Sequence, residues 1–416
     1  MKVRIHRGAA EIGGNCIELE AQGTRILLDL GRPISAALDE NVPLPNVSGL
    51  ERGGDPSLAG VVLSHPHIDH YGLIPQMAPT VPLYMGEAGY RILSEAAFFT
   101  GAAVLPRPIG FLRHREPFEI GPFRITPYLN DHSAFDAYSL LVESDGLRLF
   151  YTGDIRAHGR KAGIFEELLR RPPENVDVLL MEGTQVRANS DGTERGPSER
   201  DVENDCVGTF RETTGAVLAL FSPQNIDRLV TFYRAALRSG RDLVMDLYSA
   251  TIAAATGLAT IPQAQWDSVR VYLPRSQRSR VIRERAFHHT DAVRARRIYP
   301  EELAARRGEL VLMFRESMAR EFEVAGCLDG AHAIWSMWPG YLQQPSGERL
   351  RSTLDRLGIP LTIHHASGHA FVPDLQRLVS ALAPTSVVPI HSFAGDRFGE
   401  FFPRVERQPD GAWWPV

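Results

Sequence analysis

Residues 64–72 read SHPHIDHYG and place three histidines and one aspartate within six positions. Imidazole nitrogens together with a carboxylate form a ligand set suited to zinc, with manganese as the alternative. The segment follows the apolar run GVVLS, so we expect a strand that ends near His65. Alternate residues of an extended backbone point the same way, which places His65 and His67 on one side. The chain must then turn, so Asp69 and His70 leave in another direction and can serve a second, adjacent metal position.

Three more candidate ligands lie where other apolar runs end. They are His132 in NDHSAFDAYSLLVE, Asp154 in LFYTGDIR and His391 in VVPIHSF. Strand ends are the places where a rigid scaffold presents loop side chains. Each residue alone would be interpreted as structural. Together with HPHIDH they predict a hydrolytic site with two metals.

The segments around these residues predict a layered α/β domain. Short alternating or β-branched runs bounded by glycine indicate strands. These runs are MKVRIHRG, NCIELEAQ, TRILLDLG, GVVLSH, PFRITPYL, YSLLVES, LRLFYTGD and VDVLLMEG. One helix is expected around EAGYRILSEAAFF. Strands mixed with helices favour an α/β or αββα arrangement over about the first 190 residues.

The character of the sequence changes after Glu182. The stretch GTQVRANSDGTERGPSERD is polar and lacks periodicity, which predicts a loop, and VENDCVGTFRETTG begins a helical pattern. Between residues 216 and 360, the strand AVLALFS, the helix NIDRLVTFYRAALRSG and the strand DLVMDLY favour a parallel sheet. The chain then returns to core-like strands, PLTIHHASG and TSVVPIH, around the helix PDLQRLVSALA.

Composition narrows the class of protein. The net charge of −5, with 44% hydrophobic and 23% charged residues, is ordinary for a globular protein. Cys16, Cys206 and Cys327 are widely separated, which argues against a disulfide framework or a thiolate zinc site and favours a reducing cytoplasm. The start MKVRIHRGAAEIGGN has no apolar segment, and no window reaches eighteen apolar residues. We therefore expect a cytoplasmic protein that is not associated with a membrane.

The motifs resemble, in order, those of the metallo-β-lactamase fold in its β-CASP branch. ILLDLG, SHPHIDH, DHSAFDAYSLLVE and YTGDIR match the first four motifs, and LLMEGT, HHASGHA and VVPIH match motifs A, B and C. The resemblance is strongest to ribonuclease J and extends from residue 8 to about residue 392. It implies an αββα metallo-β-lactamase sandwich formed by residues 1–189 and 361–416, with an α/β β-CASP domain inserted over residues 190–360.

The resemblance also implies a role for each candidate residue. Two zinc ions, or manganese ions, would be bridged by Asp154. The ligands of one are His65, His67 and His132, and the ligands of the other are Asp69, His70 and His391. Asp29 would lie behind the ligands without binding metal itself. Two metals about 3.5–4 Å apart hold a hydroxide that attacks a phosphodiester.

Direct participation in catalysis is expected from Asp69, His369 and Glu182. His369 would give a proton to the leaving 3′ oxygen, while Glu182 orients it and sustains its charged form. Within HASGHA, Ser367 and Gly368 offer a hydroxyl and an unhindered backbone N–H that would cradle a phosphate, with His365 beside them. In ribonuclease J this stretch lies close to the 5′-terminal nucleotide. A plain turn before the next helix is the alternative.

A basic segment lies in the expected insert. Between residues 275 and 307 there are ten arginines and four acidic residues, a local charge of about +6. The arginines are Arg275, Arg278, Arg280, Arg283, Arg285, Arg294, Arg296, Arg297, Arg306 and Arg307. Such a surface would neutralise an RNA backbone, with an affinity that falls with salt. A solvated helix face with internal ion pairs is the alternative. We favour RNA contacts, centred on Arg278, Arg280 and Arg283.

We expect a zinc-dependent ribonuclease that acts on single-stranded RNA as a 5′ exonuclease, an endonuclease or both. Histidine at motif C favours RNA, because DNA-repair members of the branch usually carry valine there. The alternatives are a hydrolase of the same fold acting on DNA or on a lactone or thioester, and a non-catalytic RNA-binding subunit. The chain ends 25 residues after His391, so we expect the separate C-terminal domain of ribonuclease J to be missing. This leaves the oligomeric state open, with a homodimer as one option.

Overall fold

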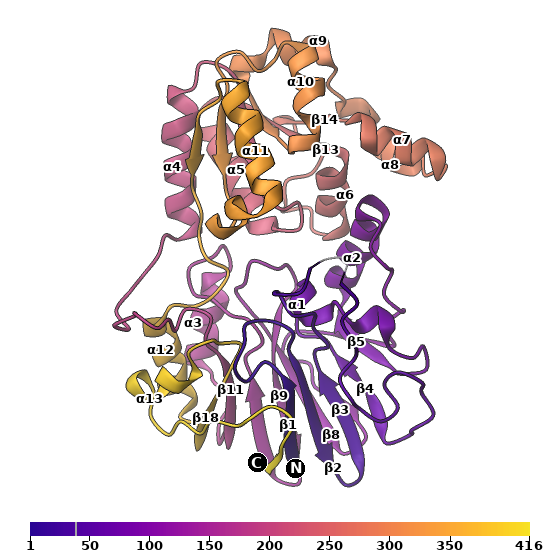
Figure 1. The fold of residues 1–416 in the computed structure, drawn as a ribbon, viewed down its shortest axis with the longest axis vertical. Helices are drawn as coiled ribbons and strands as arrows, with labels where there is room; N and C mark the ends of the chain where they lie inside the picture. Colours follow the sequence, from indigo (N-terminus) through magenta and orange to yellow (C-terminus); the bar gives the residue numbers. More distant parts are fainter. Residues whose placement is uncertain (38–39) are drawn as a thin grey trace. The chain divides into compact units, whose positions relative to one another are not determined.

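The computed structural model describes residues 1–37 and 40–416, and the chain forms two compact units that are considered one at a time (Figure 1). Unit 1 comprises residues 1–94, 103–196 and 368–416, and unit 2 comprises residues 95–102 and 197–367. The second unit is therefore an insertion in the first. No helix among the described residues has the length and apolar character needed to span a bilayer.

The unit boundaries differ slightly from the domain boundaries expected at residues 190 and 361. Unit 2 begins at Pro197 and ends at Ser367, a few residues later in both cases. The segment Glu95–Ala102 belongs to unit 2, although it precedes the insertion by almost a hundred residues. Phe98 and Phe99 explain this assignment, because both pack against the main core of unit 2. The identity of unit 2 as a β-CASP domain stays a prediction.

Unit 1 contains two sheets. The first has, in spatial order, β19 (Trp413–Pro415), β1 (Lys2–Arg7), β2 (Cys16–Ala21), β3 (Thr24–Leu28), β4 (Leu58–Val62), β5 (Leu83–Gly86) and β6 (Gly110–Leu112). The second has β18 (Ser386–Ile390), β11 (Val178–Glu182), β10 (Leu147–Tyr151), β9 (Tyr138–Ser144), β8 (Phe123–Leu129) and β7 (Phe118–Ile120). Buried residues of both sheets, such as Leu19 and Leu140, form one core between them.

Helices cover the outer face of each sheet in unit 1. α1 (Ile68–Tyr71), α2 (Glu87–Thr100) and the 3₁₀ turn Ile74–Gln76 lie on the first sheet. α3 (Ala162–Arg170), α12 (Val372–Leu382) and α13 (Phe398–Phe401) lie on the second sheet. The apolar stripe of α12 repeats at helical spacing through Val372, Leu375, Val379 and Leu382. This αββα sandwich is the fold expected from the sequence.

Unit 2 is built on a parallel sheet with both faces covered. Its strand order is β14 (Val269–Tyr272), β13 (Asp242–Asp246), β15 (Leu310–Met313), β12 (Val217–Leu220), β16 (His332–Trp335) and β17 (Leu361–Ile363). Val217 and Ala219 face one core, whereas Leu218 and Leu220 face the other. A strand that is buried on both sides reads as a continuous apolar run, which accounts for AVLALF in the sequence.

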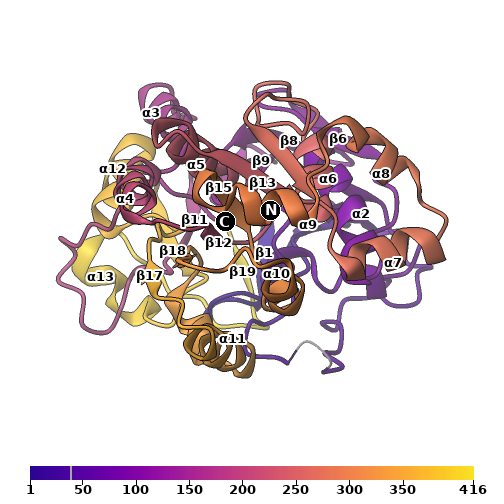
Figure 2. The same cartoon turned by 90° about the horizontal axis from the view of Figure 1, so that it is seen from above.

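Helices complete the two outer layers of unit 2. They are α4 (Glu199–Glu212), α5 (Ile226–Arg238), α6 (Leu247–Ala255), α7 (Arg275–Arg283), α8 (His288–Ala292), α9 (Pro300–Ala305), α10 (Ala319–Ala325) and α11 (Pro345–Arg356). The two views agree that α7 and α8 lie at one end of this unit, apart from α11 (Figures 1 and 2).

Two local expectations are corrected by the structure. The strand before HPHIDH ends at Val62 and does not reach His65, because the backbone N–H of Ser64 donates to the Asp29 carboxylate and not to the neighbouring strand. The polar loop after Glu182 does not extend through residue 201, because α4 begins at Glu199. Ser198 starts that helix early: its hydroxyl accepts from the backbone N–H of Asp201, whose carboxylate accepts from the backbone N–H of Ser198.

Candidate metal centre

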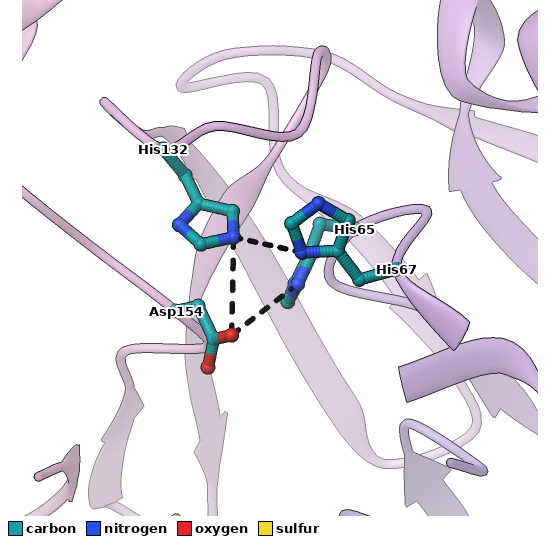
Figure 3. Close-up of side chains that lie close together, drawn as sticks. All are labelled: His65, His67, His132 and Asp154. Carbon is teal, nitrogen blue, oxygen red and sulfur yellow. Dashed lines mark hydrogen bonds and ion pairs between the residues drawn. The ribbon is translucent and has the colours of Figure 1, made fainter. Parts of the chain in front are cut away.

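The first ligand group consists of His65, His67, His132 and Asp154, whose ligand atoms all lie within 4.8 Å of one another (Figure 3). His65 and His67 come from the extended segment after β4, His132 from the loop after β8, and Asp154 from the turn after β10. His132 Nε2 lies 3.0 Å from His67 Nδ1. Asp154 Oδ2 lies 3.5 Å from His65 Nε2 and 3.8 Å from His132 Nε2.

The second ligand group consists of Asp69, His70, Asp154 and His391, again within 4.8 Å of one another. The one-turn helix α1 carries Asp69 and His70, and His391 follows β18. His70 Nε2 lies 3.2 Å from Asp154 Oδ2, and His391 Nε2 lies 3.2 Å from Asp69 Oδ2. Because Asp154 belongs to both groups, it can bridge two metal ions.

Orphaned buried atoms show that these residues suit metal ions. His65 Nε2, His70 Nε2 and both carboxylate oxygens of Asp154 are buried, yet none makes a hydrogen bond within residues 1–37 and 40–416. Buried polar groups without partners are costly and call for an explanation such as an ion. Imidazole nitrogens and a carboxylate are ligands for zinc or manganese. The donor set therefore fits divalent metals, as the sequence predicted.

The histidines of the first ligand group are kept neutral. Burial lowers the pKa of His65 and of His132 well below the ordinary value and lowers that of His67 to about 4, and repulsion between the neighbouring imidazoles adds to the effect. A neutral imidazole is the form that binds metal. Burial opposes the charge of Asp154, but the imidazoles around it hold its pKa well below the usual range. The first ligand group thus presents neutral nitrogens and an anionic carboxylate.

Asp29 orients His70 from behind the second ligand group. Its Oδ2 lies 2.7 Å from His70 Nδ1 and accepts from the hydroxyls of Ser64 (2.7 Å) and Tyr151 (2.5 Å). Its Oδ1 accepts from the backbone N–H of Ser64 at 2.6 Å. Burial disfavours the charged form of His70, but the carboxylates of Asp154 and Asp29 outweigh it and raise its pKa well above the ordinary value. A carboxylate behind a metal-binding imidazole fixes the ring and its tautomer.

Two more ligands are oriented by groups that the sequence did not identify. His132 Nδ1 lies 2.5 Å from the carbonyl oxygen of Gly368, to which it can only donate, so Nε2 is left as the ligand atom. The hydroxyl of Thr184 lies 2.9 Å from His391 Nδ1. His391 itself has φ of 51°, a left-handed backbone that is uncommon outside glycine and occurs at functional sites. Thr184 lies in the MEGT motif, so its position was visible but its role was not.

His369 and Glu182 form a pair beside both ligand groups. His369 Nδ1 lies 3.1 Å from Glu182 Oε1 and 3.8 Å from Asp154 Oδ2. The backbone N–H groups of Ile155 and Thr184 donate to the fully buried Glu182 carboxylate at 3.3 and 3.0 Å. Burial opposes the charge of His369, but Glu182 and Asp154 more than compensate and raise its pKa to about 9. The imidazole can therefore carry a proton at neutral pH.

The remaining sequence candidates lie in different units. Gly368 belongs to unit 1, where a Cβ added to it would lie 2.7 Å from Ser133 Oγ, so glycine permits a close approach. His365 and Ser367 belong to unit 2, as do Arg278, Arg280 and Arg283 on α7. These five residues and Gly368 stay predictions as RNA contacts.

Comparison with known proteins supports the assignment of the fold. Residues 24–218 match a family model described as a beta-lactamase superfamily domain. A ribonuclease J of Helicobacter pylori is 24% identical over 253 residues, which cover 59% of this chain and 36% of that protein. An RNase J-like protein of Methanocaldococcus jannaschii is 23% identical over 258 residues, covering 59% of this chain and 58% of that one. The chain thus spans between about a third and three fifths of the length of these relatives.

The fold as a whole also occurs in a solved structure. A protein of unknown function from Enterococcus faecalis V583 superimposes with a TM-score of 0.79 over 99% of both chains, at 21% identity. At this identity the match describes the fold alone. Residues 24–218 thus match the superfamily model, and the αββα sandwich of unit 1 with its two ligand groups agrees with that match.

Proposed function

We propose that this chain is a metal-dependent ribonuclease that hydrolyses phosphodiester bonds of single-stranded RNA. The observation that carries the proposal is the pair of ligand groups that share Asp154, with His369 and Glu182 beside them. The names of the relatives, ribonuclease J and RNase J-like protein, support a nuclease of this superfamily.

We assign two zinc ions to the two ligand groups, with manganese as the alternative. Two such ions lower the pKa of bound water and stabilise negative charge on phosphate oxygens. Asp154 is a member of both ligand groups, and in the second group the carboxylate of Asp69 contacts the imidazole of His391. A third group of nearby donors, Glu182, His369 and His391, also lies within 4.8 Å. We assign it to proton transfer, because Glu182 already accepts two backbone hydrogen bonds.

In this proposal His369 gives its proton to the departing 3′ oxygen. An ordinary histidine is largely neutral at pH 7 and would be a poor acid. Glu182 is fully buried and 3.1 Å from Nδ1, so it keeps His369 charged and fixes which nitrogen faces the substrate. Nε2, the nitrogen that does not face Glu182, then carries the proton to be transferred.

RNA contacts outside the metal centre are proposed at two places. His365, Ser367 and Gly368 would contact the 5′-terminal phosphate, which would favour exonucleolytic attack from that end. The second place is the α7 segment, where Arg278 is exposed and forms no ion pair with any described residue. Neutralising a phosphate with such a guanidinium releases counterions, so RNA binding would weaken with salt.

Not all of the α7 arginines are equally available for RNA. Arg280 donates to the backbone carbonyl of Phe98, and Arg283 pairs with Glu284 at 2.8 Å. The structure therefore favours Arg278 and the exposed Arg275 as phosphate contacts over the other two. Arg280 has a separate role, since it ties α7 to the end of α2.

Assembly and location belong to the same proposal. We propose a β-CASP identity for unit 2 and leave a homodimer as the assembly to test. A cytoplasmic location is supported by Cys16, Cys206 and Cys327, which are free thiols buried in separate parts of the fold.

The test uses single-stranded RNA labelled at its 5′ or 3′ end and bearing a 5′-monophosphate, 5′-triphosphate or 5′-hydroxyl. Protein loaded with zinc or manganese is expected to cleave it, and early release of the 5′ label as mononucleotide would identify 5′ exonuclease activity. Internal fragments that do not depend on the end would identify an endonuclease. The double variant Asp69→Ala, His70→Ala should be inactive, whereas His288→Ala, a substitution of an exposed histidine on α8, should not.

The result that would contradict the proposal must be obtained with protein that has been shown to bind metal. If two equivalents of metal are bound and no RNA is cleaved, the proposal is wrong. Single-stranded DNA and then a lactone or thioester would be tried in the same assay, because the fold also supports those reactions.

A further inference from the structure

The strand order of unit 2 marks one edge of its sheet as suited to a ligand. β12 and β16 are parallel neighbours, with Leu220 opposite Trp335. The connection after β12 leads through α5 to β13 on one side, whereas the connection after β16 leads through α11 to β17 on the other. Where connections diverge in this way, the loops at the carboxyl ends of the two strands leave a crevice in which open α/β sheets bind ligands.

Two exposed aromatic side chains follow β16 at this edge. Trp338 is 56% exposed and Tyr341 is 46% exposed, although Trp335 at the end of the strand is only 5% exposed. The two rings lie 5.3 Å apart and perpendicular to each other. Both belong to the 3₁₀ turn that spans Pro339–Gln343 and the residue before it. Exposed aromatic faces of this kind can stack on the planar groups of a ligand.

The turn that carries these rings is held firmly. Gly340 lies so close to the indole that a Cβ would be 2.2 Å from the ring of Trp338. Trp335 Nε1 donates to the carbonyl of Trp338 at 3.3 Å. Below the turn, the buried guanidinium of Arg228 donates to the carbonyl of Ser336 at 2.6 Å. Because the rings sit on an ordered base, little conformational freedom would be lost on binding.

The network beneath the turn also joins three strand ends. Arg228, in the first turn of α5 after β12, pairs with the buried Glu199 at 3.0 Å. Ser336, directly after β16, donates through its hydroxyl to the carbonyl of His364, directly after β17. From there the chain runs through Ser367 into unit 1 at Gly368. The aromatic turn is thus connected to the motif that we propose contacts the RNA 5′ end.

We propose that Trp338 and Tyr341 form a base-stacking site for single-stranded RNA, an inference that rests on the ribonuclease function proposed above. Aromatic faces stack on unpaired bases of any sequence. Among the exposed residues that follow Tyr341, Gln343, Gln344 and Ser346 carry amides and a hydroxyl that can hydrogen-bond base edges, with Pro345 between them.

The test measures RNA affinity in the metal-loaded protein, using a ten-nucleotide RNA with hydrolysis-resistant phosphorothioate linkages. Trp338→Ala and Tyr341→Ala are each expected to raise Kd about 5- to 150-fold, the range found when a stacked aromatic is removed. Trp338→Phe should retain most of the affinity. Tyr299→Ala is the matched control, since Tyr299 is 49% exposed in the same unit. The slope of log Kd against log salt should not change, because stacking displaces no counterions.

A second arm replaces bases by abasic residues in the same RNA. Wild-type protein and Trp338→Ala should then bind with equal affinity, because the base that the indole stacks on is gone. If the wild-type protein cleaves RNA and the alanine variants bind it unchanged, the base-stacking site is overturned while the ribonuclease function stands. A variant that alters the oligomeric state but not RNA affinity would also overturn it, in favour of contact between copies. If wild-type protein neither binds nor cleaves RNA, the proposed function itself has failed.

Discussion

Replacing Asp29 by asparagine would test how far the metal centre depends on a side chain that binds no metal. Asp29 is completely buried and accepts four hydrogen bonds, two from Ser64, one from His70 and one from Tyr151. An amide has only one oxygen. The better orientation keeps that oxygen at the Oδ2 position, where three donors meet, and turns the amide nitrogen toward the backbone N–H of Ser64. Two donors then face each other.

The expected cost follows from these contacts. A buried N–H left without an acceptor costs about 1–3 kcal/mol, so Asp29→Asn should destabilise the metal-free protein by about that amount. His70 also loses its charged partner. Loss of such a partner behind a ligand typically weakens metal binding about 10- to 100-fold. We expect that loss in the second ligand group, Asp69, His70, Asp154 and His391, with a smaller effect on the first.

The measurement is a zinc titration in competition with a chromophoric chelator, which resolves two affinities, together with urea denaturation of the metal-free protein. Asp205→Asn, on an exposed position of α4, is the matched control and should change neither. If Asp29→Asn lowers stability but leaves both zinc affinities unchanged, Asp29 supports the loop without orienting His70. If neither quantity changes, the hydrogen bonds do not contribute as we have argued.

Three other predictions follow from the same geometry. Gly368→Ala should weaken zinc binding, since the new Cβ would lie 3.3 Å from the ring of His132, and a titration that matches wild type would contradict this. The pKa of His67 is about 4 in the folded protein and 6.5 when unfolded, so the unfolded state takes up the proton first. Metal-free protein should lose on the order of 3 kcal/mol as pH falls from 6.5 to 4; a flat urea-denaturation profile would refute it. Arg278→Gln should weaken RNA binding and reduce its salt slope by about 1, whereas an unchanged slope would remove Arg278 from the interface.

The candidate ligands could be found from the sequence because each lies close behind an apolar run. His132, Asp154 and His391 follow β8, β10 and β18, which run in the same direction within one sheet, so their carboxyl ends lie at the same edge. The apolar run that marks each of these strands is a local property, so it is visible in the sequence. The parallel sheet of unit 2 was predictable for a related reason, namely apolar strands that alternate with amphipathic helices.

Apart from Asp29, the groups that orient the ligands were not predictable, because their partners are distant in sequence. The carbonyl of Gly368 meets His132 across 236 residues, and Thr184 meets His391 across 207. A backbone carbonyl carries no sequence signal at all, since every residue has one. The sequence predicted that the strand before HPHIDH ends near His65, later than the end of β4, for the same reason. The N–H of Ser64 donates to Asp29, 35 residues earlier, and not to a neighbouring strand.

The insertion of unit 2 within unit 1 sets the order in which the metal centre is made. Asp69 and His391 are 322 residues apart, and all of the second unit is translated between them. At about 5–20 residues per second, roughly 15–65 s pass between the appearance of the first of these ligands and that of the second. A nascent chain therefore lacks a complete second ligand group until nearly all of the chain has been translated, whereas the ligands of the first group, His65, His67, His132 and Asp154, all precede Pro197.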